Sequence, residues 1–335
     1  MKNRVIKLPR AVAITAFSCV GGKKESEGPL AQGFDFLSKD DYFGQSSWEK
    51  AETAMQKRSL QILLDKRDIK PRDVDIAMGG DLCNQITSTG FAYRDYSLPF
   101  MGMYGACSTM ALTMANSACM VSSGMADNAI AGASSHFCTA ERQFRTPLDY
   151  GGKRTPTAQW TVTGAANVFI EPQGKGPFIT RVCFGRIVDL GVKDANNMGA
   201  AMAPAAAQTL VEYFTHSGKT PQDYDAIYTG DLGTVGTELL KQLMIKENIP
   251  LHNHIDCGMV IYDMKEQKVP AGASGCGCSG CVLAADILPR MTKGKLKRIL
   301  FIATGALLST TTTMQKESIP CIAHLVERVA DKGDI

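Results

Sequence analysis

The stretch YGACSTMA, residues 104–111, places Cys107 among small residues directly before a long apolar run. This pattern is typical of a nucleophile at a sharp strand-to-helix turn, which Gly105 and Ala106 would allow to be tight. The free N–H groups at a helix N-terminus lower the pKa of a thiol placed there and favour the thiolate. The alternative is a small cysteine buried at a crowded helix start, because free cysteine is commonly buried. Spacing alone does not separate the two interpretations.

The elements that would position this cysteine occur twice in the chain. The strand pattern DIAMGGDL (75–82) recurs as DAIYTGDL (225–232). YGACSTMALTMANSACM in the first half has its counterpart in ASGCGCSGCVLAADILP, and DNAIAGASS (127–135) in KRILFIATGALLS (297–309). Three elements in the same order indicate a tandem duplication. We expect one half over residues 1–172 and the other over residues 173–335.

Each half alternates helices with strands, which predicts largely parallel sheets with helices on their faces. Apolar spacing predicts helices over 47–68 and 203–219. The helices that begin at Ser108 and Ser279 are apolar or small nearly all round, which is typical of helices buried between layers. The expected fold is therefore an α/β class, layered α/β/α/β/α, built from two duplicated halves.

The composition is that of a folded globular chain, with 335 residues, 44% hydrophobic and 21% charged, and a formal net charge of +3. No long basic run is present, so nucleic acid is not expected as a partner. The eleven cysteines, many in apolar surroundings, indicate reduced thiols in a reducing compartment. The stretch AVAITAFSCV follows several basic residues like a secretory signal, but its alternation predicts a first strand. No stretch approaches the ~20 apolar residues of a membrane-spanning helix, so we expect a soluble chain.

The duplication, the two buried helices and the cysteine at the start of the first one resemble the thiolase fold of thiolases and β-ketoacyl-acyl-carrier-protein synthases. Longer runs are similar to the stage V sporulation protein AD family of spore-forming bacteria: GDLCNQIT, YGACST, SSHFCTAERQFR, GRIVDLGVKDANNMGAAMAPAA, GASGCGCSG and QKESIPCIAH. The resemblance covers nearly the whole chain. It implies a thiolase-like five-layered fold, with Cys107 at the position of the superfamily's nucleophile.

Condensing enzymes of this fold carry a histidine in the loop that corresponds to DAIYTGDLG, and a His or Asn near the sequence matching AGASGCGC. This chain has Gly230-Asp231-Leu232 and Ala273-Ser274-Gly275 at these places, without an imidazole. The missing side chains normally stabilise an oxyanion or polarise the thioester, whereas an aspartate would raise the thiol pKa. The resemblance therefore implies a protein that is not an enzyme, with Cys107 as a wall of a binding site. An active acyl transferase that uses Cys107 is the alternative.

The resemblance further implies a ligand, pyridine-2,6-dicarboxylic acid (dipicolinic acid), free or as its calcium chelate, and a role in its uptake into the developing spore. No cofactor is expected, and calcium only together with the ligand. The implied partners are other proteins of the same sporulation operon, including membrane channel subunits, and a second copy in a homodimer. The expected location is soluble or peripheral on the spore inner membrane. A structural subunit that only docks onto a membrane channel is a further alternative.

Several polar residues are candidates for the wall of this pocket. His136 follows the strand NAIAGAS, and the carboxyl ends of such strands open onto a ligand crevice; a buried structural histidine is the alternative. Asp81 ends the matching strand, where a turn or a helix cap is the alternative role. The expected ligand-binding residues are Asp81, Cys107, Ser135, His136, Arg142, Arg145, Asp231 and His254.

Charge poses a difficulty for this pocket, because Asp81 and Asp231 would repel a dicarboxylate. Either Arg142 or Arg145 compensates, since guanidinium groups suit carboxylate ligands, or the ligand arrives as a calcium chelate and an aspartate completes the coordination. Pairing of the arginines with Glu141 and Asp149 on a solvated loop is the alternative for them.

The triplet CGCSGC places Cys276, Cys278 and Cys281 at a spacing that suits metal ligands. It is also the repeat partner of GACST, where small residues allow close approach of helices. We therefore predict no metal site there.

Overall fold

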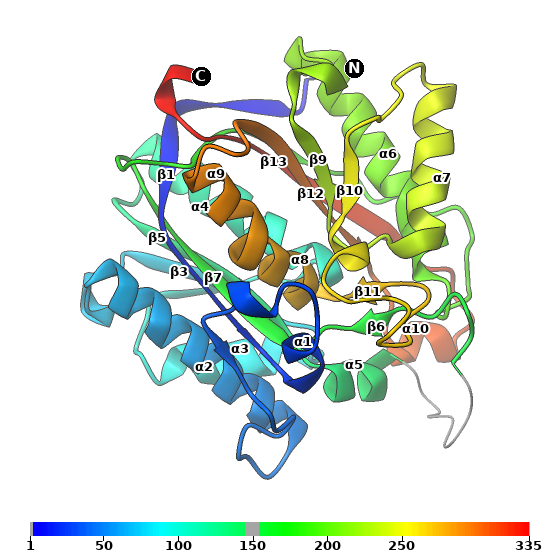
Figure 1. Cartoon of the computed structure of the whole chain (residues 1–335), viewed down its shortest axis with the longest axis horizontal. Coiled ribbons are helices and arrows are strands. Elements are labelled where there is room, and N and C mark those ends of the chain that lie inside the picture. Colours follow the sequence, from blue (N-terminus) through cyan, green and yellow to red (C-terminus); the bar gives the residue numbers. More distant parts are fainter. Residues whose placement is uncertain (1–2, 145–153, 335) are drawn as a thin grey trace.

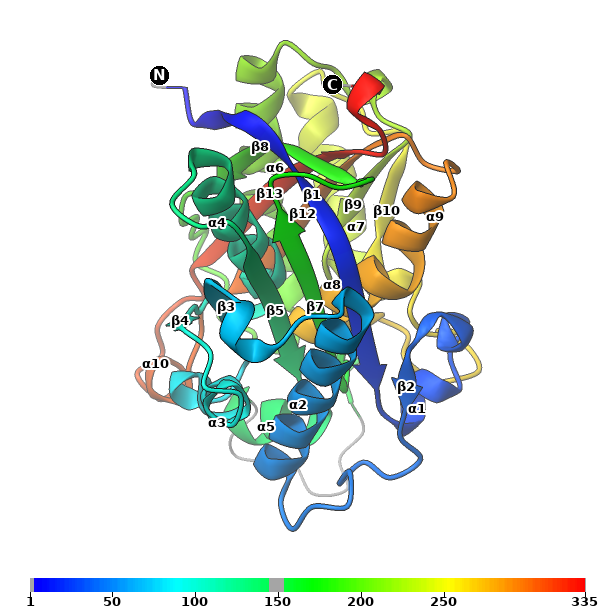
Figure 2. The same ribbon diagram turned by 90° about the vertical axis from the view of Figure 1, so that its left-hand side faces the viewer.

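The computed structural model describes residues 3–144 and 154–334. Within them, eleven strands form one large mixed sheet, and helices cover it (Figures 1 and 2). The strands of its N-terminal part are β1 (Val5–Gly21), β2 (Phe36–Leu37), β3 (Ile76–Gly80), β4 (Phe100–Gly102), β5 (Ala129–Ser135) and β7 (Gly164–Glu171). Those of its C-terminal part are β8 (Phe178–Phe184), β9 (Ala226–Thr229), β10 (His254–Asp256), β12 (Arg298–Ala306) and β13 (Cys321–Val329). Two further strands, β6 (Trp160–Thr161) and β11 (Ala273–Ser274), pair with each other.

The two parts of the sheet repeat the same strand order. From the edge inward it is β4-β3-β5-β7-β1 in one and β10-β9-β12-β13-β8 in the other. The long strand β1 pairs with β8 along its first part and with β7 along its second, so hydrogen bonds join both parts into one sheet. The predicted α/β fold from two duplicated halves is confirmed. The predicted boundary at residue 172 falls in the turn between β7 and β8, and its placement stays a prediction.

The expectation of largely parallel sheets is wrong. Strands β3, β4 and β5 are parallel, as are β9, β10 and β12. However, β7 is antiparallel to β5 and β1, and β13 to β12 and β8. A parallel neighbour requires a crossover that brings the chain back to the end at which the previous strand began. Strand β7 instead starts beside the end of β5, where Gly164 pairs with Ser135, and β13 starts beside the end of β12, where Cys321 pairs with Ala306.

The helices form three layers around the sheet. They are α1 (Lys23–Ser26), α2 (Trp48–Arg67), α3 (Thr87–Arg94), α4 (Thr109–Ser123), α5 (Phe137–Phe144), α6 (Met198–Ser217), α7 (Gly233–Lys246), α8 (Cys276–Val282), α9 (Leu288–Thr292) and α10 (Thr310–Met314). Side chains along β12 show the layering: Phe301 and Ala303 join the core with α4 and α8, whereas Leu300 and Ile302 join the core with α6. In the N-terminal part, Ile130 of β5 packs in the core with α2 and α3. Helices α4 and α8 therefore lie between the two halves of the sheet (Figure 1).

Local sequence explains several element ends. Ser47 caps α2 by accepting a hydrogen bond from the N–H of Lys50. Gly218 ends α6 in the left-handed region, with φ of 69°. The first strand is longer than predicted and begins at Val5, so the stretch that resembles a secretory signal is part of β1. In the described ranges, we find no helix with both the length and the apolar character of a membrane span.

Candidate functional site

Cys107 lies in a tight turn directly ahead of α4. The turn spans Ala106–Ser108 and begins with a sharp change of chain direction at Ala106. The φ of Ala106 is +50°, which is unusual for a residue with a side chain. Two hydroxyl groups hold this turn: Ser108 Oγ donates to the carbonyl of Gly105 at 2.6 Å, and Thr109 Oγ1 donates to that of Ala106 at 2.7 Å. The motif GACST thus builds the predicted elbow, and Cys107 itself is only 5% exposed.

The thiol of Cys107 faces residues from the C-terminal half. Asp231, which follows β9, interacts with it through a side-chain hydrogen bond, and Cys276 at the start of α8 is close enough for its charge to act on it. Asp231 is fully buried; its Oδ2 accepts from the N–H of Gly275 at 2.8 Å and its Oδ1 from Thr304 Oγ1 at 3.2 Å. A carboxyl group therefore stands beside the thiol where the condensing enzymes were expected to have an imidazole.

This arrangement determines the protonation of both groups. Burial raises the pKa of Cys107 well above its ordinary value, and the charge of Asp231 raises it further. Burial also raises the pKa of Asp231, to about 7. The expectation that the helix N-terminus favours the thiolate is wrong, because desolvation and a neighbouring carboxyl outweigh the helix dipole. Cys107 is a neutral thiol at neutral pH.

We expect alkylation to reveal this protonation. At pH 8, iodoacetamide should modify Cys107 at least about tenfold more slowly than the half-buried Cys119, because the thiolate is the reactive form. Asp231→Asn should raise the rate at Cys107 several-fold by removing the neighbouring charge. Peptide mapping by mass spectrometry reports both rates, with Cys119 as the internal reference. Equal labelling of Cys107 and Cys119 in the parent protein would contradict the assignment.

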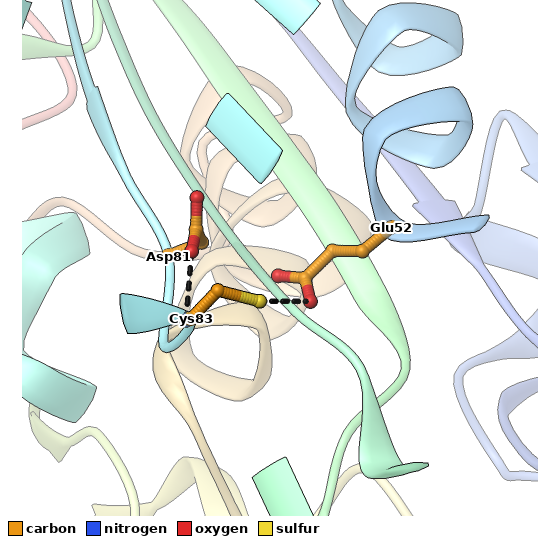
Figure 3. Close-up of side chains that lie close together, drawn as sticks. All are labelled: Glu52, Asp81 and Cys83. Atoms are coloured by element: carbon orange, nitrogen blue, oxygen red, sulfur yellow. Dashed lines mark hydrogen bonds between the residues drawn. The ribbon is translucent and has the colours of Figure 1, made fainter. Parts of the chain in front are cut away.

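A second group of buried acids, Glu52 and Asp81, lies beside Cys83 in the N-terminal half (Figure 3). Asp81 follows β3 and accepts from the N–H of Cys83 at 2.8 Å and from both the N–H and the hydroxyl of Thr89 at 2.7 Å. Glu52 projects from α2, and the thiol of Cys83 lies 3.5 Å from its Oε2. The ligand atoms of Glu52, Asp81 and Cys83 lie within 4.8 Å of one another, which brings them within reach of a single metal ion.

The oxygens of Glu52 are already engaged. Oε1 accepts from Ser134 Oγ at 3.0 Å and Oε2 from Thr139 Oγ1 at 2.8 Å. Burial and the charge of Asp81 raise the pKa of Glu52 to about 8, and burial raises that of Asp81. The Glu52 carboxyl is therefore mostly protonated at neutral pH, and the contacts of both groups are those of a satisfied hydrogen-bond network.

The two groups of acids are related by the internal repeat. Asp81 and Asp231 occupy the same place after β3 and β9, and Cys107 and Cys276 precede or begin the two central helices. Burial raises the pKa of Cys276 well above its ordinary value, and the charges of Glu52, Asp81 and Asp231 raise it further. We call these five residues the thiol–acid cluster: Glu52, Asp81, Cys107, Asp231 and Cys276.

A cavity of about 350 Å³ adjoins this cluster. It is lined by Leu82, Cys83, Asn84, Gln85, Ile86, Gly102, Tyr104, Gln143, Leu307, Leu308 and Ser309. Burial and the charges of Cys107, Cys276 and Asp81 raise the pKa of the Tyr104 phenol, which places this group toward the cluster. Among the residues that the structure describes, none hydrogen-bonds to the Tyr104 hydroxyl. The ring thus forms a cavity wall, with a free polar group at its inner end.

Arg142 lines a second depression of 280 Å³, which shares Cys83, Asn84 and Gln143 with the first cavity. Its side chain is 52% exposed and pairs with Glu49 at 2.5 Å. The structure thus places Arg142 beside the cavity, at its outer side. The other predicted arginine, Arg145, lies outside the described residues.

Ser135 and His136 are buried, and backbone groups use their polar atoms. Ser135 Oγ donates to the carbonyl of Val162 at 2.7 Å and accepts from the N–H of Gly277 at 3.1 Å. His136 Nε2 donates to the carbonyl of Asp41 at 2.8 Å, and its Nδ1 accepts from the N–H of Cys138 at 3.2 Å. Burial lowers the pKa of His136, so its ring is neutral. A ligand would have to displace one of these bonds to reach either side chain.

His254 lies on β10 next to Asp256. Its Nε2 donates to Thr229 Oγ1 at 2.8 Å, and this hydroxyl donates to Asp256 Oδ2 at 2.6 Å. Burial lowers the pKa of His254 to about 4. The imidazole therefore supports the loop that carries Asp231, because Asp256 also accepts from the N–H groups of Leu232 and Gly233.

The three cysteines of CGCSGC are buried in α8, and their thiols point to different backbone carbonyls. Cys276 contacts that of Ser134 at 2.9 Å, whereas Cys278 contacts that of Gly230 at 3.6 Å. The Sγ of Cys281 lies 3.8 Å from the carbonyl of Val20. Their roles in the described structure are therefore in packing around α8.

Sequence reasoning missed Tyr104, Glu52 and Cys276 as parts of this site. Tyr104 and Cys276 stand in the two copies of the repeated motif that drew attention to Cys107, so the repeat itself carried their signal. The signal for Glu52 was weaker: it is a charged residue on the same face of the helix as the apolar Met55, which is buried. The position of Glu52 beside Ser134 of β5 and Cys83 comes only from the packing of α2.

The fold and the buried thiol at the start of a central helix define a thiolase-like protein. Solved structures with this fold include 3-oxoacyl-[acyl-carrier-protein] synthase III from Aquifex aeolicus, with a TM-score of 0.57 at 12% identity over 95% of this chain and 99% of that one. An OleA variant from Xanthomonas campestris has a TM-score of 0.61 at 14% identity over 97% and 99% of the two chains.

The family follows from closer sequence similarity. The family model described as stage V sporulation protein AD matches residues 2–328. The stage V sporulation protein AD of Bacillus subtilis is 41% identical over 314 residues, which cover 93% of each chain. The chain belongs to the stage V sporulation protein AD family of sporulation proteins.

Proposed function

We propose that this chain binds dipicolinic acid in the cavity beside the thiol–acid cluster and acts in its uptake into the developing spore, without catalysing a reaction. The observation that carries the proposal is the neutral Cys107 thiol, which faces the buried carboxyl of Asp231 next to a cavity of about 350 Å³. This pairing suits binding better than nucleophilic attack, because nucleophilic chemistry requires the thiolate.

The cavity offers complementary groups for a pyridine dicarboxylate. The ring of Tyr104 presents an aromatic surface for the pyridine, and the amides of Asn84 and Gln143 offer N–H donors for the carboxylates. The raised pKa values of Asp231 and Glu52 lessen the charge problem, because a protonated carboxyl group near the cavity does not repel a carboxylate. Binding as the calcium chelate is the second way, with carboxylate oxygens completing the coordination of the ion.

Calorimetric titration with dipicolinate, with and without calcium, tests the proposal. We expect saturable heat, and a lower affinity for benzene-1,3-dicarboxylate, which has the same carboxylates without the ring nitrogen. If neither form of dipicolinate gives heat or thermal stabilisation, the binding function is wrong, and a docking role on a membrane channel is left.

Tyr104→Phe should weaken dipicolinate binding about fivefold, because one hydrogen bond from the hydroxyl contributes about 1 kcal/mol. Tyr104→Ala should weaken it further, since the aromatic wall is also removed. Phe91→Ala is the matched control, because Phe91 is similarly exposed but lines neither of the two cavities described above. An unchanged affinity in both Tyr104 variants would remove this residue from the binding site.

An acyl transferase is the second candidate, favoured by the elbow that presents Cys107 at the start of α4. Incubation with acyl-CoA followed by intact-mass measurement distinguishes the two functions. A stable adduct that disappears in Cys107→Ala would establish acylation and overturn the binding-only proposal.

The proposed assembly is a homodimer that works with membrane channel subunits of the same operon. Strand β4 is an edge strand of the sheet, and its side chains Phe100 and Met101 are exposed. An exposed apolar edge of this kind is suited to pair with another chain. Light scattering of the purified protein measures the oligomeric state.

A further inference from the structure

A cavity of about 320 Å³ is lined by residues of α6 and α7. Figure 1 shows these two helices on the outer side of the C-terminal half. The cavity is independent of the site described above, since α6 packs on the opposite face of β12 from α4 and α8. One wall is apolar and consists of Pro204, Ala207, Val211 and Leu243. The other carries polar groups from one face of α6 and from the segment after β8.

The polar wall contains two hydrogen-bond acceptors without donors. Glu212 is only 9% exposed, and its Oε1 has no hydrogen-bond partner among the described residues. The Oε1 of Gln208, one helical turn earlier, is also buried and unpartnered in the described structure. His216 Nδ1 lies 3.4 Å from the carboxylate of Glu212, but it donates to the Glu212 backbone carbonyl at 3.0 Å. A buried acceptor without a donor lowers the stability of the folded protein, so a ligand that donates hydrogen bonds to these two oxygens would be stabilised here.

A cation stands at the same cavity. Arg186 is 41% exposed, and its guanidinium reaches Glu212 Oε2 only at 3.8 Å, which is longer than a hydrogen bond. The N–H donors of Arg186 therefore face the cavity. Their contact with the described residues is the long ion pair with Glu212. Lys246 and Glu247 at the end of α7 line the cavity as well, with opposite charges.

We propose that this cavity binds a small zwitterion of the α-amino acid class with an aliphatic side chain. The ammonium group donates to Glu212 and Gln208, the carboxylate accepts from Arg186, and the side chain lies on the apolar wall. An ammonium has three donors, so it satisfies both acceptors at once. A ligand with only a positive charge would meet Arg186 and Lys246, and a ligand with only a negative charge would meet Glu212. A zwitterion avoids both repulsions.

Thermal-shift and calorimetric titrations with L-alanine, L-valine and L-leucine test this site. We expect saturable binding at millimolar concentration or below, and weaker binding of propylamine and propionate, which each carry one of the two charges. Glu212→Gln and Arg186→Gln should each weaken binding about tenfold, as expected for the loss of a charge-assisted hydrogen bond. Phe91→Ala, at a residue that lines neither cavity, should leave amino-acid binding unchanged.

Circular dichroism and the heat of dipicolinate binding show whether the Glu212 and Arg186 variants keep their fold. The proposal is overturned if none of the three amino acids binds, if propylamine or propionate binds as well as they do, or if folded Glu212→Gln binds them like the parent protein.

Discussion

Gly305→Ala is expected to lower the free energy of unfolding by about 3 kcal/mol, a cost at the upper end for overpacking a buried site. A Cβ atom at this position of β12 would lie 2.0 Å from the carbonyl oxygen of Gly105, in the turn that carries Cys107. Both partners in this contact are backbone atoms, so no side chain can rotate away. Relief requires β12 or the turn to move, which would also displace Cys107 and weaken the proposed binding of dipicolinate.

Urea unfolding of the two proteins at one pH measures this effect. Gly90→Ala is the matched control, because a Cβ atom at Gly90 in α3 meets no atom within 4 Å. It should be neutral or stabilising by up to about 1 kcal/mol, as is usual for glycine to alanine within a helix. Equal stability of Gly305→Ala and the parent would show that the close approach of β12 to the turn is absent in solution.

The second large effect is a loss of stability between pH 6.5 and 8.5. Burial raises the folded-state pKa of four carboxyl groups: Glu25 to about 7, Glu52 to about 8, Asp231 to about 7 and Asp256 to about 6. In the unfolded chain these groups titrate near pH 4. The folded state therefore binds more protons over this range, and the free energy of unfolding falls as pH rises. We expect these four groups to contribute a fall of about 4 kcal/mol across the two pH units.

The pH range is chosen to exclude an opposing contribution. Burial lowers the pKa of His254 and His324 to about 4, so the folded state binds fewer protons than the unfolded chain below pH 6.5. Stability from these histidines rises with pH up to about that point and then stays constant. Above it, the carboxyl groups determine the slope up to about pH 7.5. Nearer pH 8.5 the thiols ionise in the unfolded chain and make the fall in stability steeper.

Urea unfolding at several pH values within this range measures the slope. Glu52→Gln should make it shallower by up to about 1.4 kcal/mol per pH unit, the contribution of one proton. Glu49→Gln, an exposed residue on the same helix, is the matched control and should leave the slope unchanged. A stability that does not vary from pH 6.5 to 8.5 would show that these carboxyl groups are ionised in the folded protein.

Much of the architecture was predictable because it depends on local patterns and on their repetition. The recurrence of GDL after two strands predicted two equivalent halves, and their strand orders agree. The composition of the helices predicted to begin at Ser108 and Ser279 indicated their central position, since only helices enclosed on all sides lack a polar face. The predicted start of the second helix was three residues late, because α8 begins at Cys276. The parallel sheets were wrongly predicted because strand direction depends on where a connection returns, which residue types along a strand do not reveal.

The candidate site divides in the same way. The motif around Cys107 by itself determined a tight turn at the start of a buried helix, because glycine, alanine and two hydroxyl side chains act within a few residues of one another. Only the tertiary structure decided that the Cys107 thiol stays neutral and that Glu52 lies close to Asp81. It also decided that both ring nitrogens of His136 form hydrogen bonds with backbone groups. These properties depend on burial and on contacts between residues far apart in the chain, and desolvation is set by everything that surrounds a group rather than by its neighbours in sequence.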